Sequence, residues 1–247
     1  MDKAAPVDTP LQPPVPGPKP EPRPEAGEQP QPTTPPMPPT VAPAPSGKPT
    51  FLPQGNAELE PPAKPELPSA EELACRTRLT VMGADFKEGK PSPDRNGCYM
   101  PFPVEVGRLT GEIAINAPVT LNCAMAESAG RFLRDVASPA AKAEFGSPLK
   151  SVAQASGFVC RSRNGTSKLS EHAFGNALDI ASFTLGDGTV IAVEPAPPPK
   201  NEKFLRELRN AACGPFKTVL GPGSDADHAL HFHFDLAHRR NGGTFCQ

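Results

Sequence analysis

The sequence predicts an α+β domain, a small antiparallel sheet with flanking helices, preceded by a disordered proline-rich segment. Three observations support this fold class. Of the 36 prolines, 23 fall within residues 1–68. In the remainder, apolar residues recur at helical spacing in a few segments and alternate with polar residues in several others. Strand-like and helix-like segments are both short and bounded by Gly, Pro and Asn, which is typical of α+β domains.

The first 68 residues mix proline with Glu, Gln, Thr, Ala and Lys, and Phe51 is their only aromatic residue. Such a composition buries too little apolar surface to offset the entropy of ordering the chain. We therefore predict an extended, partly polyproline linker over residues 1–68. Residues 69–247 have a normal size for one domain with its own core.

Three helices are predicted in the second part. Residues 69–79, "SAEELACRTRL", begin with Ser69 and carry acidic residues in the first turn. From Cys123 to Ala137 the apolar residues recur at helical spacing, with Asn122 as the N-cap. Another helix is predicted to start near Asn201.

Between the helices, several segments favour strands. The turn-rich segment 90–106 contains Asn96-Gly97 and leads into strand-like apolar residues. Strands are also predicted at 111–121 and 151–163, and a hairpin over 176–193 that turns at residues 186–188. Residues 195–199, "PAPPP", form a rigid connector. A further strand, a Gly-Pro-Gly loop and the strand 230–237 complete the domain.

Composition excludes some functions. The net charge of −2 and the absence of a basic patch indicate no nucleic-acid partner. No run of about 18 apolar residues exists to span a membrane. The first ten residues lack the apolar core of a secretory signal. Either a signal has been removed or the natural start lies upstream.

Six cysteines lie in the predicted domain, and none forms a C-x-x-C pair. An even number of widely spaced cysteines predicts three disulfides and an oxidising compartment. The alternative is buried free thiols in a cytosolic protein. Six cysteines allow 15 pairings, and sequence does not choose among them. As a hypothesis we pair them in chain order: Cys75–Cys98, Cys123–Cys160 and Cys213–Cys246.

The segment "LHFHFDLA", residues 230–237, alternates polar with aromatic side chains. Successive side chains of a strand point to opposite faces. Phe232 and Phe234 are therefore predicted to enter a core, while His231, His233 and Asp235 share the other face. The strand predicts a polar site on one side and apolar packing on the other.

A second segment, "SEHAFGNALDIASF" at residues 170–183, can complete that site. Asp179 lies in an apolar run, where a carboxylate is costly to bury unless it is paired or binds a metal. Gly175 permits a tight loop that brings His172 back beside Asp179. With His233, these residues form the two-histidine, one-carboxylate set of catalytic zinc, with a fourth position for water. The alternative is that each histidine and Asp179 makes only ordinary structural hydrogen bonds.

The segment "SEHAFGNALDI" resembles the S-x-H-x-x-G-x-A-x-D motif of zinc D-Ala-D-Ala carboxypeptidases, lysostaphin-like endopeptidases and the hedgehog signalling domain. The later "HFH" is similar to the second motif of that group. Residues 75–247 more closely resemble the bacterial extensin-like C-terminal domain family. This likeness rests on "CRSR", "LSEHAFGNALDI", "VLGPGSDADHALHFHFDLA" and the spread of the cysteines.

The resemblance implies that His172, Asp179 and His233 bind Zn²⁺. It also implies that His231 contacts the attacking water or the oxyanion. In the carboxypeptidases an acidic base lies three residues before the zinc histidine, and here that place is Leu230.

Without that acid, the role of base passes to His231, with His228 or Asp227 behind it. Arg161 and Ser170 are candidates for binding a substrate carbonyl or carboxylate, and the alternative for both is ordinary hydrogen bonding within a loop.

These expectations describe residues 69–247 as an extensin-like, zinc metallopeptidase-type domain. It would hydrolyse peptide bonds of bacterial peptidoglycan, as an endopeptidase or a carboxypeptidase acting on stem peptides or crosslinks. The protein would be a periplasmic or secreted monomer whose partners are peptidoglycan peptides. The alternative, which Leu230 favours, is a non-catalytic zinc-containing module that binds peptidoglycan or a protein of the cell envelope.

Overall fold

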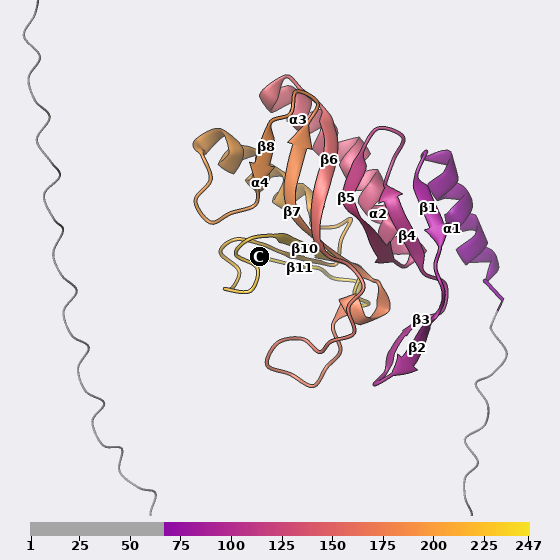
Figure 1. Ribbon diagram of the computed structural model, residues 1–247. Coiled ribbons are helices and arrows are strands. Elements are labelled where there is room, and N and C mark those ends of the chain that lie inside the picture. Colours follow the sequence, from indigo (N-terminus) through magenta and orange to yellow (C-terminus); the bar gives the residue numbers. More distant parts are fainter. Residues whose placement is uncertain (1–66) are drawn as a thin grey trace, which may run out of the picture. The chain divides into compact units, whose positions relative to one another are not determined.

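The computed structural model describes residues 67–247, apart from the side chains of residues 93–95 (Figure 1). Most of the predicted linker, residues 1–68, therefore lies outside the described residues. The rest forms a nine-stranded sheet in the order β1-β4-β5-β6-β7-β10-β9-β11, with β8 paired to β7, and a separate β2-β3 hairpin. Helices and strands both contribute to the domain, so the predicted α+β class is confirmed.

Eleven strands lie in the described part of the chain. They are β1 Asp85–Glu88, β2 Ser92–Arg95, β3 Cys98–Met100, β4 Val104–Arg108, β5 Ala114–Leu121, β6 Leu149–Ser156, β7 Ala177–Leu185, β8 Val190–Ala192, β9 Thr218–Leu220, β10 Phe232–Asp235 and β11 Phe245–Cys246. The helical elements are α1 Ala70–Val81, α2 Cys123–Phe132, the π-helical turn η1 Leu133–Ala137, α3 Ser138–Phe145, the 3₁₀ helix η2 Glu171–Phe174 and α4 Pro199–Ala212.

The sheet is mixed rather than purely antiparallel. β5 pairs with β6 in parallel, and so does β9 with β11. Parallel neighbours need a long crossover connection, and α2, η1 and α3 provide it between β5 and β6. The strand pairs that matter for the site, β6-β7 and β7-β10, are antiparallel.

Helix starts follow the predicted caps. The side chain of Ser69 accepts a hydrogen bond from the backbone N–H of Glu72, and that of Asn122 accepts one from Met125. The second predicted helix, Cys123 to Ala137, is longer than expected, because η1 continues directly into α3. It ends at Gly146, whose φ of 80° is a left-handed conformation that glycine adopts at no steric cost.

The predicted strand 151–163 is shifted. β6 begins at Leu149 and ends at Ser156, and residues 157–170 form a loop instead. A Cβ atom at Gly157 would lie 2.3 Å from a methyl group of Val119, so the chain passes close to β5 at this point. Residues of this loop line the cleft of the candidate site.

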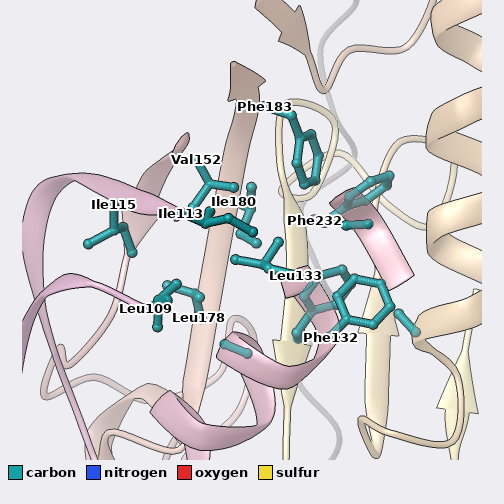
Figure 2. Packing of buried hydrophobic residues seen from close by; sticks show 14 of the residues in the cluster. Leu109, Ile113, Ile115, Phe132, Leu133, Val152, Leu178, Ile180, Phe183 and Phe232 are labelled. Atoms are coloured by element: carbon teal, nitrogen blue, oxygen red, sulfur yellow. The ribbon is translucent and has the colours of Figure 1, made fainter. Parts of the chain in front are cut away.

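Helices pack phenylalanines onto one face of the sheet. Phe132 of α2 makes an edge contact with Phe234 of β10 at 5.6 Å between ring centroids, and Phe204 of α4 makes one with Phe183 of β7 at 5.8 Å. Figure 2 shows Phe132, Phe183 and Phe232 within this core. Phe232 and Phe234 are both buried there, as their alternation with histidines predicted.

All six cysteines form disulfides, so the predicted number of three is confirmed. Only Cys213–Cys246 has the predicted partners. The pairs Cys75–Cys98 and Cys123–Cys160 were wrong: the structure has Cys75–Cys123 and Cys98–Cys160.

The physical reason for the difference is tertiary packing. Cys75 lies on the buried side of α1, next to the start of α2, where Cys123 is the first residue. α1 and α2 lie side by side (Figure 1). Cys98 of β3 meets the loop after β6, which carries Cys160.

None of the helices in the described part of the chain combines the length and apolar character needed to cross a bilayer.

The core assignment can be tested with Phe132→Ala. Phe132 is buried against Phe216 and Phe234, so we expect a loss of about 3–5 kcal/mol in the free energy of unfolding. Urea denaturation of the variant and wild type measures it. Leu73→Ala is the matched control because that side chain is 53% exposed, and it should stay within about 0.5 kcal/mol of wild type. A loss below about 1 kcal/mol for Phe132→Ala would contradict this core.

Candidate metal centre

Three short elements bring His172, Asp179 and His233 together. Asp179 lies on β7 and His233 on β10, and these antiparallel strands place the two residues directly opposite each other. Side chains of directly paired residues lie on the same face of the sheet. That face is opposite to the one carrying Phe232 and Phe234.

His172 reaches the same place from η2. The side chain of Ser170 caps this 3₁₀ helix, accepting a hydrogen bond from the backbone N–H of His172 at 3.4 Å. Gly175 ends it with a φ of 61°, and a Cβ atom there would lie 2.2 Å from the sulfur of Met100. Both the backbone conformation and the space therefore require glycine, and the tight turn returns the chain to β7.

The side chains converge at hydrogen-bonding distances. Asp179 lies 3.2 Å from His172 (Oδ2 to Nε2) and 2.9 Å from His233 (Oδ1 to Nδ1). The two histidine nitrogens, Nε2 of His172 and Nδ1 of His233, are 3.2 Å apart. One ligand atom from each of the three residues lies within 4.8 Å of the other two. All three side chains are buried, so water does not solvate this cluster freely.

In each histidine the far nitrogen, which is the ring nitrogen that does not face Asp179, already has a hydrogen-bond partner. Nδ1 of His172 donates to the carbonyl oxygen of Gly157 at 2.6 Å, and Nε2 of His233 donates to Asp235 at 3.1 Å. In a neutral imidazole the other nitrogen is then a lone-pair acceptor. Two lone pairs and the carboxylate of Asp179 thus point at one another, which requires a cation between them. Outer-shell acceptors of this kind are typical of histidines that bind metal.

In the metal-free protein a proton can serve as that cation. Burial alone would lower the pKa of His233, but hydrogen bonds and negative charge from Asp179 and Asp235 raise it to about 9. Burial alone would raise the pKa of Asp179, but its hydrogen bonds and charge interactions with His172 and His233 hold this pKa well below the usual range. His233 therefore carries a proton near neutral pH, and a metal ion bound by the three residues would displace this proton.

Two more histidines border the cluster. Nε2 of His231 lies 3.7 Å from Asp179, and burial lowers the pKa of His231. Nδ1 of His228 is hydrogen-bonded to both carboxylate oxygens of Asp225, at 2.7 and 2.8 Å. The ring of His228 is 5.3 Å from that of His231 and 5.6 Å from that of His233, measured between centroids.

An open cleft of about 550 Å³ leads to these side chains. His228, His231 and His233 line it, whereas the buried His172 and Asp179 and the exposed His238 do not. The cleft is therefore bordered by three of the five histidines in the chain.

The predicted substrate-binding residues also border this cleft. Arg161 is exposed on its wall, while Ser170 is buried and its hydroxyl is used by the η2 cap. Asp227 lines it too and accepts a hydrogen bond from Asn164. Leu230 does not line the cleft and is 66% exposed. The position three residues before His233 therefore offers no acidic side chain to the cleft.

Some site residues were missed by sequence reasoning. Asp225 lies three residues before His228 in "DADH", a spacing that permits its contact with the imidazole but is common in turns. Asp235 was placed on the polar face without a role. The carbonyl of Gly157 belongs to the backbone, so no residue type in the sequence signals it. Arg239, which also lines the cleft, follows β10 and belongs to no sequence motif that would indicate a role.

A family model described as "Extensin-like protein C-terminus" matches residues 73–247. No curated protein and no solved structure matches the chain.

The raised pKa of His233 predicts how the metal-free protein responds to pH. A pKa of about 9 in the folded state against 6.5 in the unfolded state stabilises the fold fully below about pH 6.5. This contribution, about 3 kcal/mol, is lost as the pH rises through 9. Urea denaturation of chelator-treated protein between pH 6 and 10 measures the loss. His233→Gln should abolish most of this slope, and an unchanged slope in that variant would contradict the assignment.

Proposed function

The chain belongs to the extensin-like C-terminal family, and we propose that its domain is a zinc-dependent hydrolase of peptide bonds in bacterial peptidoglycan. One observation carries the proposal. Two buried histidines with fixed far nitrogens and one buried carboxylate direct their lone pairs at a common point beside an open cleft. The likeness of "SEHAFGNALDI" and "HFH" to motifs of zinc peptidases supports the choice of reaction.

The donor set suits zinc. Two imidazole nitrogens and one carboxylate oxygen are the ligands of many catalytic zinc sites, and they leave a position for water or substrate. Zinc held in this way supplies a Lewis acid for the scissile carbonyl and lowers the pKa of a bound water toward 7. Gly157 and Asp235 would keep the two histidines in the tautomers that ligation requires.

His231 is the best placed general base. It lines the cleft on the same strand face as His233, and its side chain is 20% exposed. Because burial lowers its pKa, the imidazole is neutral at pH 7 and can accept a proton. It can then return that proton to the leaving amine.

His228 would assist from the side of the cleft next to His231. A carboxylate only accepts hydrogen bonds, so its contact with Asp225 places the proton of neutral His228 on Nδ1. Nε2 remains as the nitrogen that can accept a proton or, in the charged imidazole, donate a hydrogen bond to a developing oxyanion. Asp225 orients this ring much as Asp235 orients His233.

The substrate class follows from the family resemblance and the compartment. Three disulfides among the described residues are typical of secreted or periplasmic proteins, where peptidoglycan is accessible. The cleft is open and lined by both cationic and anionic side chains, which suits a peptide of mixed charge. Arg161 would bind a carbonyl or carboxylate of that peptide.

A second candidate function is a non-catalytic zinc-containing module of the cell envelope. It is favoured by Leu230, which occupies the position of the acidic base, is exposed and does not line the cleft. In that case His231 would contact ligand without transferring a proton. The two functions differ in whether peptide bonds are cleaved.

The metal assignment predicts one zinc ion per chain. His233→Ala removes a ligand, so zinc content after loading and dialysis, measured by mass spectrometry of the metal, should fall from one to near zero per chain. His238→Ala is the matched control, because His238 is exposed and outside the cleft, and it should keep the full content. Full zinc retention in His233→Ala would contradict the site.

The catalytic assignment predicts a different result for His231→Ala. All three ligands remain, so zinc should stay bound. Release of muropeptides from purified sacculi should fall by a factor of about 10² to 10⁴, the usual effect of losing general acid–base help. Unchanged release would remove His231 from the mechanism. If wild type binds sacculi in a zinc-dependent way and releases nothing, the binding module is the correct function.

A further inference from the structure

Arg239 is held rigidly in the wall of the cleft. Its Nε donates to the carbonyl oxygen of Lys217 at 3.2 Å, and its Nη2 donates to the hydroxyl of Thr218 at 2.7 Å. Its guanidinium carbon lies 5.6 Å from the centroid of the Phe245 ring, a cation–π distance. A surface arginine usually loses much side-chain entropy on binding a ligand, and this one is already ordered.

Arg239 makes no direct ion pair with a carboxylate among the side chains that the structure describes. Its partners are a carbonyl, a hydroxyl and an aromatic ring, and the nearest linked acid, Asp235, is joined to it only through the hydroxyl of Thr218. Arg163 in the same cleft differs, because it is 3.2 Å from Glu171. Nη1 of Arg239 takes part in neither hydrogen bond, so the guanidinium retains donors for an anion.

The position of Arg239 relative to the candidate metal centre is fixed by strand register. Its partner Thr218 lies opposite Asp235, and Leu220 lies opposite His233 in the same antiparallel pair. Two residues along a strand correspond to about 7 Å. An anion bound to Arg239 would therefore lie about two residues of extended peptide away from the reacting bond.

We infer that Arg239, fixed by Thr218 and Phe245, forms a binding subsite for a carboxylate of the substrate about two residues from the bond that is cleaved. A guanidinium matches a carboxylate in planar, two-pronged hydrogen bonding. This inference rests on the proposed function for the identity of the substrate as a stem peptide. That carboxylate is either the chain terminus or a side chain of the peptide.

The probe is a synthetic peptidoglycan stem pentapeptide in three forms: unmodified, amidated at the C-terminus, and amidated at its side-chain carboxylate. Calorimetric titration of the full chain measures the dissociation constant of each, and mass spectrometry afterwards records cleavage. Wild type should bind the unmodified peptide about 10- to 100-fold more tightly than one of the amides, as expected for a hydrogen bond to a charged group. The amide that binds weakly identifies which carboxylate Arg239 contacts.

Arg239→Gln should weaken binding of the unmodified peptide to the level of that amide and leave the affinity of the amide itself unchanged. Arg240→Gln removes the same charge from the next residue, which is exposed and outside the cleft, and should alter none of the constants. Arg239→Lys keeps the positive charge but lacks the planar, two-pronged donor group. Its affinity for the unmodified peptide should lie between those of Arg239→Gln and wild type. This order separates recognition of the carboxylate from a general loss of structure.

Three outcomes overturn the inference: equal weakening of acid and amide by Arg239→Gln, no preference of wild type for the acid, or no binding of any form. Failure of the proposed function has a different signature. If the acid is preferred through Arg239 but no peptide is cleaved, the carboxylate subsite is supported and the proposed hydrolytic function is refuted. If peptides are cleaved without regard to amidation, the hydrolytic function is supported and the subsite is refuted.

Discussion

The antiparallel pairing of β7 with β10 is the constraint on which the rest of the structure depends. It sets Asp179 opposite His233 and, in the next registers, Ile180 opposite Phe232 and Leu178 opposite Phe234. One face of the pair is thereby apolar and receives the phenylalanines of α2 and α4. The other face gathers charge. A slip of one residue would bury the histidines in the core and expose the phenylalanines, so stability and site geometry are specified by the same register.

The polar groups on that face form a buried cluster that requires a proton or another cation. A carboxylate and two imidazoles at about 3 Å from one another cannot all be buried without a positive charge. The outer acceptors, Gly157 and Asp235, fix which nitrogen faces inward. If the proposed zinc ion binds here, it competes with a proton for the same lone pairs, so we expect the affinity for the ion to rise with pH.

Much of this could be predicted from sequence, and the failures share one cause. Alternation in "HFHFD" indicated both faces of β10, and the apolar run around Asp179 indicated a buried carboxylate, because these signals are local. Two of the three disulfides were mispaired, since Cys75 meets Cys123 only through the packing of α1 on α2. The carbonyl of Gly157 and the contact of Asp225 with His228 likewise depend on loop paths that no local pattern specifies.

The bridge between Cys98 and Cys160 makes the shape of the cleft depend on the redox state of the compartment. It ties the β2-β3 hairpin to the loop that carries Arg161 and Arg163 along the cleft, and both lie at the same end of the sheet in Figure 1. In a reducing compartment the two thiols are not joined, and this wall of the cleft then lacks its covalent link to the hairpin, although hydrogen bonds such as that from Asn164 to Asp227 remain. A newly made chain would gain the link only when it meets an oxidant. Oxidation would thus be the step that completes this wall of the cleft.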